Sequence, residues 1–459
     1  MKIKFYNTLH HKLESFKPIN DGIVKIYSCG PTVYDYAHIG NLSTYLRTDI
    51  LRRILEYFGY NVYQVMNITD VGHLVNDDDA GEDKLEKGAK REGKTVWEIA
   101  KFYENAFKND IKKLNIENPE VFARATDHIK EQILMVKILE KKGFAYRIND
   151  GIYFDTSKIK NYGELANLDA QKQIAGARVE VNPEKKNPED FALWKFEERG
   201  IKRQMVWNTP WGKRTFPGWH IECSAMSIKY LGEQFDIHTG GVDHIGVHHT
   251  NEIAQNQAAT GHKVVNYWIH FEHLLFENHK ISKSAGSFIK LTDIEKKNFN
   301  PLALRYLILT ANYRHKLNFT WKSLKIAQES LESLYRHIQN LYSRKAGKII
   351  STYKKEFLKC LANNLDTPQA LAVLWKLVKA DAKKEDIYKT ILDFDRVLGL
   401  KLDLIKPIKI SKNIQDLVQK MDQVREEKDW KQADKIRNEL EKKGYIVKNT
   451  DNGSIIEKA

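Results

Sequence analysis

The sequence predicts an α/β protein built on a Rossmann-type, doubly wound parallel sheet. Two β-branched runs, 22–28 (GIVKIYS) and 61–69 (NVYQVMNIT), have the composition of buried parallel strands. A helical pattern separates them and ends at Gly59, a residue type that commonly terminates helices. Its apolar residues recur every four positions: Leu42, Leu46, Ile50, Ile54 and Phe58. Strand, helix and strand in this order form the first unit of a doubly wound sheet.

The middle of the chain interrupts this pattern. From about 110 to 205 the sequence is mixed and contains turn-rich pieces such as VNPEKKNPED, so we interpret it as an inserted subdomain. Strand-like and glycine-rich signals return at 234–246 (QFDIHTGGVDHIG), and 264–276 (VVNYWIHFEHLLF) continues the sheet. Residues 1–319 are therefore predicted to form one domain that contains the insert.

The remainder of the chain is predicted to be mainly helical. An amphipathic helix is indicated by apolar residues at alternating spacings of three and four: Leu324, Ala327, Leu331, Leu334, Ile338 and Leu341. Too few heptads follow for a coiled coil, so residues 320–404 are expected to form an α-helical bundle domain. Residues 405–459 form a small, highly charged C-terminal domain with a helix around DWKQADKIRNELEKKG.

Composition narrows the class of protein. The net charge of +14 favours a polyanionic partner, because each phosphate contact releases counterions; a basic but merely soluble surface is the alternative. The three cysteines, Cys29, Cys223 and Cys360, are too few for a disulfide framework and suggest a reducing, cytoplasmic environment. No stretch has the length and apolarity of a signal core or a membrane span, so no membrane partner is expected.

Four residues are candidate metal ligands. His248 and Glu252 lie four positions apart in VHHTNEIAQNQAA and would share one face of a helix. With Cys29 and Cys223 they offer donor types that Zn²⁺ accepts in near-tetrahedral geometry. Spacing alone leaves the alternatives open, because a lone cysteine is usually a small buried hydrophobic residue and such a His–Glu pair is commonly a surface contact.

Two short motifs are candidate phosphate sites. HIGN (38–41) follows a strand and opens a helix, where free backbone N–H groups and the positive helix end favour anions. Its glycine would let the backbone, or a flat ring, approach closely. KISKS (280–284) offers two lysines and two serines in a polar segment, which suits a developing phosphate charge. Either motif alone is common, whereas the two in this order are specific.

Together the motifs resemble the HIGH and KMSKS signatures of class I aminoacyl-tRNA synthetases. From about residue 20 to the C-terminus the chain is similar to the cysteinyl-tRNA synthetase family, in CGPTVYDYAHIGN, MNITDVGH, DFALWK, PGWHIECSAMS, HTGGVDH, HHTNEIAQ and KISKSAGSF. It departs from the family pattern at three points. Asn41, which cannot carry charge, occupies the fourth HIGH position; Ile281 replaces a methionine; and GVHHTNE replaces the commoner FPHHENE.

The resemblance implies a two-step reaction. The carboxylate of L-cysteine attacks the α-phosphate of ATP, which binds with Mg²⁺, and gives cysteinyl-adenylate and pyrophosphate. The 3′-terminal ribose of tRNA(Cys) then accepts the cysteinyl group. The first step is an in-line phosphoryl displacement, in which positioning and charge stabilisation dominate.

The resemblance also assigns the ATP site. The residues concerned are His38, Gly40, Asn41, Gly240, Gly241, Asp243, Lys280, Ser282 and Lys283. His38 and Asn41 would contact the phosphates, and Lys280 and Lys283 would close over the leaving pyrophosphate; these four are the catalytic candidates. Gly40 would lie under the adenine. Asp243 would accept hydrogen bonds from the ribose hydroxyls, with the two glycines before it clearing space, although it could also be a turn residue.

One Zn²⁺ per chain is implied as well, held by Cys29, Cys223, His248 and Glu252. Zinc binds a thiolate directly, whereas the hydroxyl of serine stays protonated and is a poor ligand. Cysteine would thus be selected without a separate editing domain. Trp219 would form a wall of the cysteine pocket and Thr69 would contact the polar end of the substrate; a core tryptophan and a strand-end cap are the alternatives.

The C-terminal regions bear on the partner. Residues 320–404 resemble the helical anticodon-binding domain of this synthetase group, and 405–459 resemble its small terminal domain, so both are expected to contact tRNA(Cys). The family resemblance favours a monomer. Two other functions are less consistent with the sequence. A cysteine ligase of the mycothiol pathway type, which acts on an amino sugar, lacks the full anticodon-binding end that this chain has. A non-catalytic RNA-binding paralogue would have lost the HIGH, KMSKS or zinc residues, and this chain keeps them.

Overall fold

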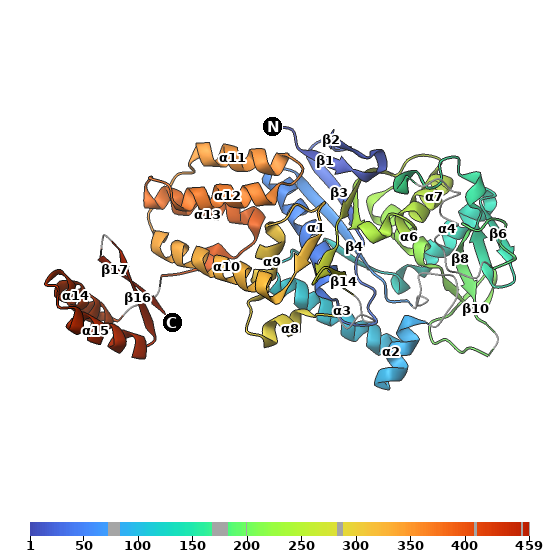
Figure 1. Ribbon diagram of the computed structural model, residues 1–459. Helices are drawn as coiled ribbons and strands as arrows, with labels where there is room; N and C mark the ends of the chain where they lie inside the picture. The colour runs from blue at the N-terminus through green and yellow to red at the C-terminus, as the bar shows by residue number, and fades with distance from the viewer. Residues whose placement is uncertain are drawn as a thin grey trace. The chain divides into compact units, whose positions relative to one another are not determined.

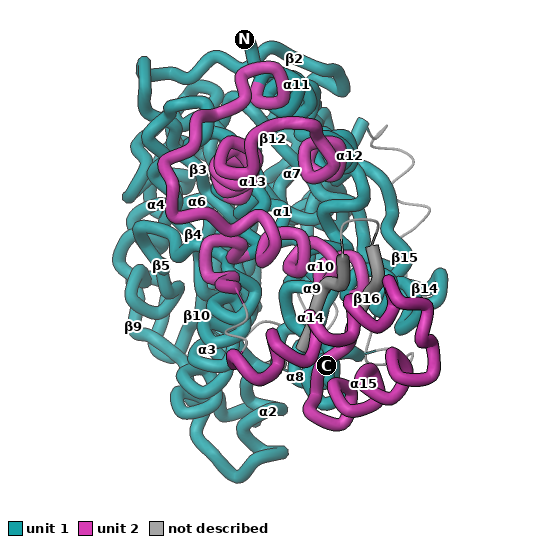
Figure 2. The backbone as a smooth tube through the Cα atoms, turned by 90° about the vertical axis from the view of Figure 1, so that its left-hand side faces the viewer, with its two compact units in different colours: residues 1–328, 355–373, 396–400 teal, residues 329–354, 374–395, 401–459 magenta. Residues whose placement is uncertain are grey.

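The computed structural model describes residues 1–71, 83–167, 182–198, 200–281, 288–407, 411–450 and 453–458. The chain divides into two compact units, drawn in separate colours in Figure 2. The first unit comprises residues 1–328, 355–373 and 396–400. The second comprises residues 329–354, 374–395 and 401–459. No helix of the described part of the chain is both long and apolar enough to cross a lipid bilayer.

A five-stranded sheet forms the centre of the first unit, in the order β12-β11-β3-β4-β5. Figure 1 labels its neighbouring strands β3 and β4. Its strands are β3 (Ile23–Ser28), β4 (Asn61–Ile68), β5 (Val121–Arg124), β11 (Phe235–Gly241) and β12 (Val265–Phe271). All four pairings are parallel. The chain winds outward from β3 in one direction through β4 and β5, and in the other through β11 and β12. The predicted doubly wound sheet is confirmed.

The helix α1 (Ile39–Tyr57) joins β3 to β4, as the spacing of its apolar residues predicts. Leu42, Leu46 and Ile54 on its inner face are fully buried. Gly59 follows the helix with a φ of +94°, a conformation that favours glycine. Burying this face fixes the helix, and therefore its N-terminus, against the sheet.

A second five-stranded sheet is antiparallel and has the order β6-β7-β8-β10-β9. Its strands are β6 (Ala145–Ile148), β7 (Gly151–Phe154), β8 (Phe191–Phe196), β9 (Trp207–Thr209) and β10 (Gly212–Pro217). The sequence suggested an insert from about 110 to 205. In the structure this sheet spans 145–217, and residues 121–124 instead add the edge strand β5 to the central sheet.

Three helices connect the two sheets: α4 (Ile129–Lys141), α6 (Trp219–Leu231) and α7 (His248–Thr260). One hydrophobic cluster joins them to the antiparallel sheet through residues such as Val136, Trp194, Ile221 and Ala254. Figure 1 shows α6 and α7 side by side. This packing matters because α6 and α7 carry three of the four candidate metal ligands.

The other helices and strands of residues 1–319 are shorter or peripheral. They are β1 (Lys4–Asn7), β2 (Lys12–Ser15), α2 (Lys84–Glu92), α3 (Val96–Lys113), β13 (Leu274–Phe276), β14 (His279–Lys280), α8 (Leu291–Lys296), α9 (Pro301–Leu309) and β15 (Leu317–Phe319). The strands β14, β13 and β15 form a small sheet, and β14 carries Lys280, the first residue of KISKS.

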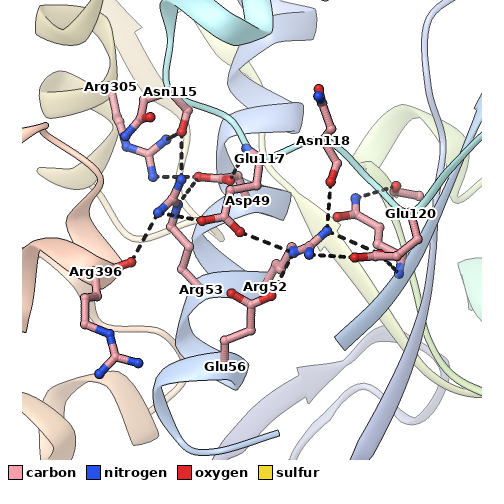
Figure 3. A network of polar contacts seen from close by, with 12 residues as sticks. Asp49, Arg52, Arg53, Glu56, Asn115, Glu117, Asn118, Glu120, Arg305 and Arg396 are labelled. Carbon is pink, nitrogen blue, oxygen red and sulfur yellow. Dashed lines mark hydrogen bonds and ion pairs between the residues drawn. The ribbon is translucent and has the colours of Figure 1, made fainter. Parts of the chain in front are cut away.

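A buried ionic network ties α1 to α9 and to residues 396–400 (Figure 3). The side chain of Arg305 on α9 is fully buried and its Nη2 lies 2.6 Å from Oδ2 of Asp49 on α1. Arg53 contacts the same oxygen at 2.8 Å. Arg305 also donates to the carbonyl of Leu398 at 2.6 Å. Burial alone would raise the pKa of Asp49, but the two guanidinium groups outweigh burial and lower it.

The rest of the chain is helical, which confirms the predicted helical region. It contains α10 (Trp321–Leu341), α11 (Ser351–Ala362), α12 (Thr367–Val378) and α13 (Lys384–Leu398), followed by α14 (Lys412–Glu426) and α15 (Trp430–Lys442). The strands β16 (Tyr445–Thr450) and β17 (Gly453–Lys458) pair as a hairpin. Met421, Ile436 and Leu440 form part of a separate small core for α14 and α15.

Candidate active site with a metal cluster

The candidate site lies where the strand order reverses, at the carboxyl ends of β3 and β11. Ligands of open α/β sheets bind in this crevice. The N–H of Cys29, just after β3, donates to the carbonyl of Thr239 on β11 at 3.1 Å. A cavity of about 270 Å³ opens here. Its lining includes several residues predicted from the sequence: Cys29, His38, Gly40, Asn41, Gly241, Asp243 and Lys280.

The four candidate metal ligands meet in space. One donor atom from each of Cys29, Cys223, His248 and Glu252 lies within 4.8 Å of the other three, and all four residues are buried. Cys29 follows β3 and Cys223 lies on α6. His248 and Glu252 lie one turn apart on α7, and Nε2 of His248 is 2.9 Å from Oε1 of Glu252.

The chemistry of this cluster fits a cation. Burial raises the pKa of the Cys29 thiol, and the charge of Glu252 adds to the rise. A thiol that coordinates a metal ion loses its proton, so a cation would reverse this effect. Two sulfurs, one imidazole and one carboxylate are donors that Zn²⁺ binds. The residues therefore fit the predicted metal, and the proximity of the side chains supports the grouping made from the sequence.

Three further histidines surround the cluster, and the sequence analysis missed them. His238 Nε2 lies 2.9 Å from Oε2 of Glu252, and His249 Nε2 lies 3.2 Å from Sγ of Cys29. His270 in turn contacts Nδ1 of His249 at 2.7 Å. Neighbours of this kind orient metal ligands. His238 and His249 stand in motifs already assigned to the site, HTGGVDH and HHTNEIAQ, whereas His270 stands in a segment predicted only as a strand.

Trp219 and Thr69 lie beside the cluster and outside the lining of the cavity. The ring of Trp219, at the start of α6, has its centroid 4.7 Å from that of His248. Thr69, directly after β4, is buried, and its hydroxyl donates to Oε2 of Glu222 at 3.2 Å. Trp219 therefore packs against one candidate ligand, and Thr69 is hydrogen-bonded to the residue that precedes another, Cys223.

The HIGH-like motif forms the first turn of α1. The N–H of Asn41 donates to Nδ1 of His38 at 3.2 Å, and the N–H of His38 donates to Oδ1 of Asn41 at 3.3 Å. This reciprocal capping box holds the two side chains against each other. A side chain at Gly40 would lie 2.8 Å from the ring of His38, so only glycine leaves the ring this close to the backbone.

The segment that follows KISKS contacts this turn directly. The N–H of Ile39 donates to the carbonyl of Ile289 at 2.9 Å, and the ring of Phe288 has its centroid 5.4 Å from that of His38. The two described residues of the second motif, Lys280 and Ile281, line the same cavity as the HIGH-like turn. Ser282 and Lys283 themselves lie outside the described residues.

Asp243 lies in a short 3-10 helix after β11 and faces the same cavity. Burial would raise its pKa, but nearby positive groups, including His244 and Lys280, lower the pKa overall, so the group favours the charged state. The preceding glycines have a more local role than expected. A Cβ at Gly241 would lie 2.3 Å from Asp243 itself, and one at Gly240 would lie 2.6 Å from the ring of His249.

The fold and this site together define a class I aminoacyl-tRNA synthetase. Two solved structures of Mycobacterium tuberculosis methionyl-tRNA synthetase with methionyl-adenylate share the fold, with TM-scores of 0.55 and 0.56. Their sequence identities to this chain are 12% and 13%, and each match covers 82% of this chain and 90% of the other. The family described as tRNA synthetases class I (C) catalytic domain matches residues 15–329. The chain belongs to the cysteinyl-tRNA synthetase family.

Curated relatives match almost the whole chain. Cysteine–tRNA ligase 1 of Burkholderia lata is 48% identical over 456 residues, which cover 99% of this chain and 96% of the relative. The cysteine–tRNA ligase of Treponema denticola is 44% identical and covers 97% and 98% of the two chains. That of Thermococcus onnurineus is 37% identical and covers 99% of each. The similarity therefore includes the C-terminal helical regions as well as the catalytic part.

Proposed function

We propose that this protein activates L-cysteine with ATP and Mg²⁺ and transfers the cysteinyl group to the 3′ end of tRNA(Cys). The observation that carries the proposal is the buried group of Cys29, Cys223, His248 and Glu252 beside the HIGH-like turn. Cys29 lines the same cavity as His38, so a bound thiol and the phosphates of ATP would lie in one crevice. Proximity of the two reactants is the main requirement of an in-line displacement.

The metal-binding residues would select the amino acid. A zinc ion bound by the four ligands supplies a Lewis acid that favours a thiolate over the alcohol of serine. Glu252 is held by His238, and Cys29 contacts His249, so both ligands are oriented before a substrate enters. The indole of Trp219, which packs at a tilt against the ring of His248, would form a wall of the pocket for the short side chain of cysteine.

The ATP-binding residues would act through position and charge. The N-terminus of α1 would present its positive end to the phosphates, beside the side chains of His38 and Asn41. Asp243, which favours the charged state, would accept hydrogen bonds from the ribose hydroxyls. Lys280, whose charge reaches Asp243, would approach the pyrophosphate together with Ser282 and Lys283 as it leaves.

The remaining expectations concern tRNA and the cellular setting. Residues 320–404 and 405–459 would bind tRNA(Cys), chiefly through lysine and arginine contacts with the phosphate backbone. The full-length relatives support a tRNA partner over the amino-sugar ligase. The three cysteines are unpaired, which agrees with a cytoplasmic protein, and we propose that it acts as a monomer.

The experiment that tests this function is aminoacylation of a tRNA(Cys) transcript with cysteine and ATP. Serine and an amino-sugar acceptor are supplied in parallel reactions. We expect cysteinyl-tRNA to form with cysteine alone, and metal analysis of the purified protein to give one zinc per chain. Formation of cysteinyl-adenylate with transfer only to the sugar would instead establish the ligase, and absence of adenylate would exclude both.

A further inference from the structure

A chain of hydrogen bonds runs from the loop after β3 to α6, next to the metal cluster. The N–H of Gly30 donates to Oδ1 of Asn67 at 2.8 Å. Nδ2 of Asn67 donates to Oγ1 of Thr69 at 3.1 Å. The hydroxyl of Thr69 donates to Oε2 of Glu222 at 3.2 Å. Asn67, Thr69 and Glu222 are all almost completely buried.

The direction of these hydrogen bonds is determined by chemistry. The backbone N–H of Gly30 can only donate, so the oxygen of the Asn67 amide faces it and the NH₂ group faces Thr69. A carboxylate can only accept, so the single hydroxyl proton of Thr69 points to Glu222. A hydroxyl oxygen has two lone pairs, and Asn67 occupies one. The remaining lone pair can only accept a hydrogen bond.

The chain is also fixed in position relative to the metal ligands. Gly30 follows Cys29 and Glu222 precedes Cys223, so both ends adjoin a thiol of the cluster. The N–H of Thr69 donates to the carbonyl of Pro31, and its own carbonyl accepts from Val33, each at 3.0 Å. A Cβ at Gly30 would lie 1.8 Å from the carbonyl oxygen of Asn67, which shows how closely the two backbones approach.

We propose that Asn67 and Glu222 are positioning residues that hold the hydroxyl of Thr69 as an acceptor for the α-ammonium group of the substrate. This inference rests on the proposed function, because it takes cysteine as the substrate. Of the three polar groups of cysteine, only the ammonium donates hydrogen bonds; the thiolate and the carboxylate do not. The carboxylate of Glu222 lies behind the hydroxyl and attracts the same positive charge.

The inference predicts that this group of residues recognises the amine and not the thiol. A suitable pair of probes is L-cysteine and 3-mercaptopropionate, which has the thiol and carboxylate of cysteine but no amine. Binding of each probe to the zinc-loaded, full-length protein is measured by calorimetry. Zinc content is measured in the same samples, so that loss of the metal is recognised directly.

The decisive variant is Glu222→Gln. The glutamine NH₂ group can donate to Thr69 and occupy its free lone pair, and the negative charge is lost. We expect cysteine to bind at least about tenfold more weakly, because hydrogen bonds that involve a charged group are stronger than those between neutral groups. Binding of 3-mercaptopropionate should stay within about twofold, because the substitution removes nothing that this probe contacts.

Thr69→Val and Thr69→Ser test the same point without changing α6. The valine variant should lose the preference for cysteine over 3-mercaptopropionate, and the serine variant, which keeps the hydroxyl, should retain it. Glu197→Gln is the matched control, because Glu197 is a carboxylate paired with Arg214 outside this group of residues. It should bind both probes as the wild type does.

Two results would overturn the inference. One is an equal loss of affinity for both probes in Glu222→Gln with zinc retained, which would mark a merely structural role. The other is an unchanged preference of Thr69→Val for cysteine over 3-mercaptopropionate. This second result would overturn the inference even if Glu222→Gln does not fold. Failure of the proposed function gives a different result, because the wild-type protein would then not charge tRNA(Cys) at all.

Discussion

At the scale of single residues, Asn41 shows how a departure from a family motif can be accommodated. Its amide oxygen accepts the N–H of His38, and its own N–H is capped by the imidazole. The residue therefore has a structural task besides any contact with phosphate. It fixes the orientation of the histidine that faces the cavity.

We predict that Asn41→Ala raises the KM for ATP and leaves the KM for cysteine unchanged. Losing the reciprocal cap costs about 0.5–2 kcal/mol, which corresponds to a rise of roughly two- to thirtyfold. Pyrophosphate exchange at varied ATP and at varied cysteine separates the two constants. An unchanged KM for ATP would show that the capping oxygen does not position His38 for the nucleotide.

The metal cluster gives a second prediction at this scale. Cys223→Ser replaces a soft sulfur ligand by a hydroxyl that keeps its proton, so zinc should be lost on dialysis against a chelator. Cys360→Ser is the matched control, since Cys360 lies on α11 outside the candidate metal cluster. Metal analysis should find zinc in the control and not in Cys223→Ser. Zinc retained by both variants would contradict the ligand assignment.

At the scale of elements, the contacts of α1 decide how its N-terminus is held. The helix is fixed near its middle by Asp49, whose carboxylate lies between Arg305 on α9 and Arg53 on the next turn (Figure 3). All three side chains are buried, so removing Arg305 breaks a buried ion pair, leaves Arg53 alone to balance the carboxylate, and takes a donor from the carbonyl of Leu398.

Accordingly, Arg305→Met is predicted to lower the free energy of unfolding by about 3–5 kcal/mol. The measurement is the midpoint of the urea unfolding transition at neutral pH. Lys229→Met removes the exposed ion pair with Glu131 and serves as the control, with an expected loss within about 1 kcal/mol. A similar small change in both variants would mean that water still reaches the ions around Asp49.

A further prediction concerns the pH dependence of stability where α3 faces α8. Burial, with a contribution from Glu295, raises the pKa of Asp110 to about 6, although Lys113 partly offsets the rise. The folded state then binds more protons than the unfolded chain between about pH 4 and 6, so Asp110 makes stability fall as pH rises through this range.

Asp110→Asn should remove this contribution. The variant is expected to be about 1–2 kcal/mol more stable than the wild type at pH 7, after allowing for partial solvent screening, and equal to it near pH 4. Urea titrations at several pH values give the comparison. Asp21→Asn, at an exposed position, is the control and should follow the wild type. A gain at pH 7 that persists at pH 4 would rule out protonation as the cause.

Local patterns predicted the elements better than the site. The spacing of Leu42, Leu46 and Ile54 predicts α1 because burial follows a helical period. The meeting of Cys29 with Cys223 depends on the packing of α6 against β3 and β4, which no local pattern encodes. Donor type alone made the two cysteines candidates, and the family resemblance strengthened the grouping. His238 was missed for the same reason, because its contact with Glu252 arises from packing of α7 on β11.

At the scale of the whole molecule, the net charge of +14 is the property most relevant to tRNA. If lysines and arginines contact the phosphate backbone, each contact releases counterions. The two predicted domain boundaries, after residues 319 and 404, remain a prediction, because the two compact units interleave along the chain instead of following one another. The electrostatic argument does not depend on where those boundaries lie.

We therefore predict a strong salt dependence of tRNA(Cys) binding. Affinity should fall by roughly a thousandfold between 50 and 200 mM salt, as for proteins that neutralise several phosphates. Filter binding or fluorescence titration at several salt concentrations gives the slope. Binding of cysteine, a small zwitterion, is the control and should change little. A flat salt profile for tRNA would contradict the expected backbone contacts.

The order of the metal ligands along the chain has a consequence for synthesis on the ribosome. Cys29 is made early, while Cys223, His248 and Glu252 follow much later. At about 5–20 residues per second, roughly 10–45 s pass before the last ligand is made. During that interval the thiol of Cys29 lacks the three other ligands with which it would bind a metal, and it is accessible to oxidants. If the four residues bind zinc as proposed, each newly made molecule needs a reducing environment before its metal site can form.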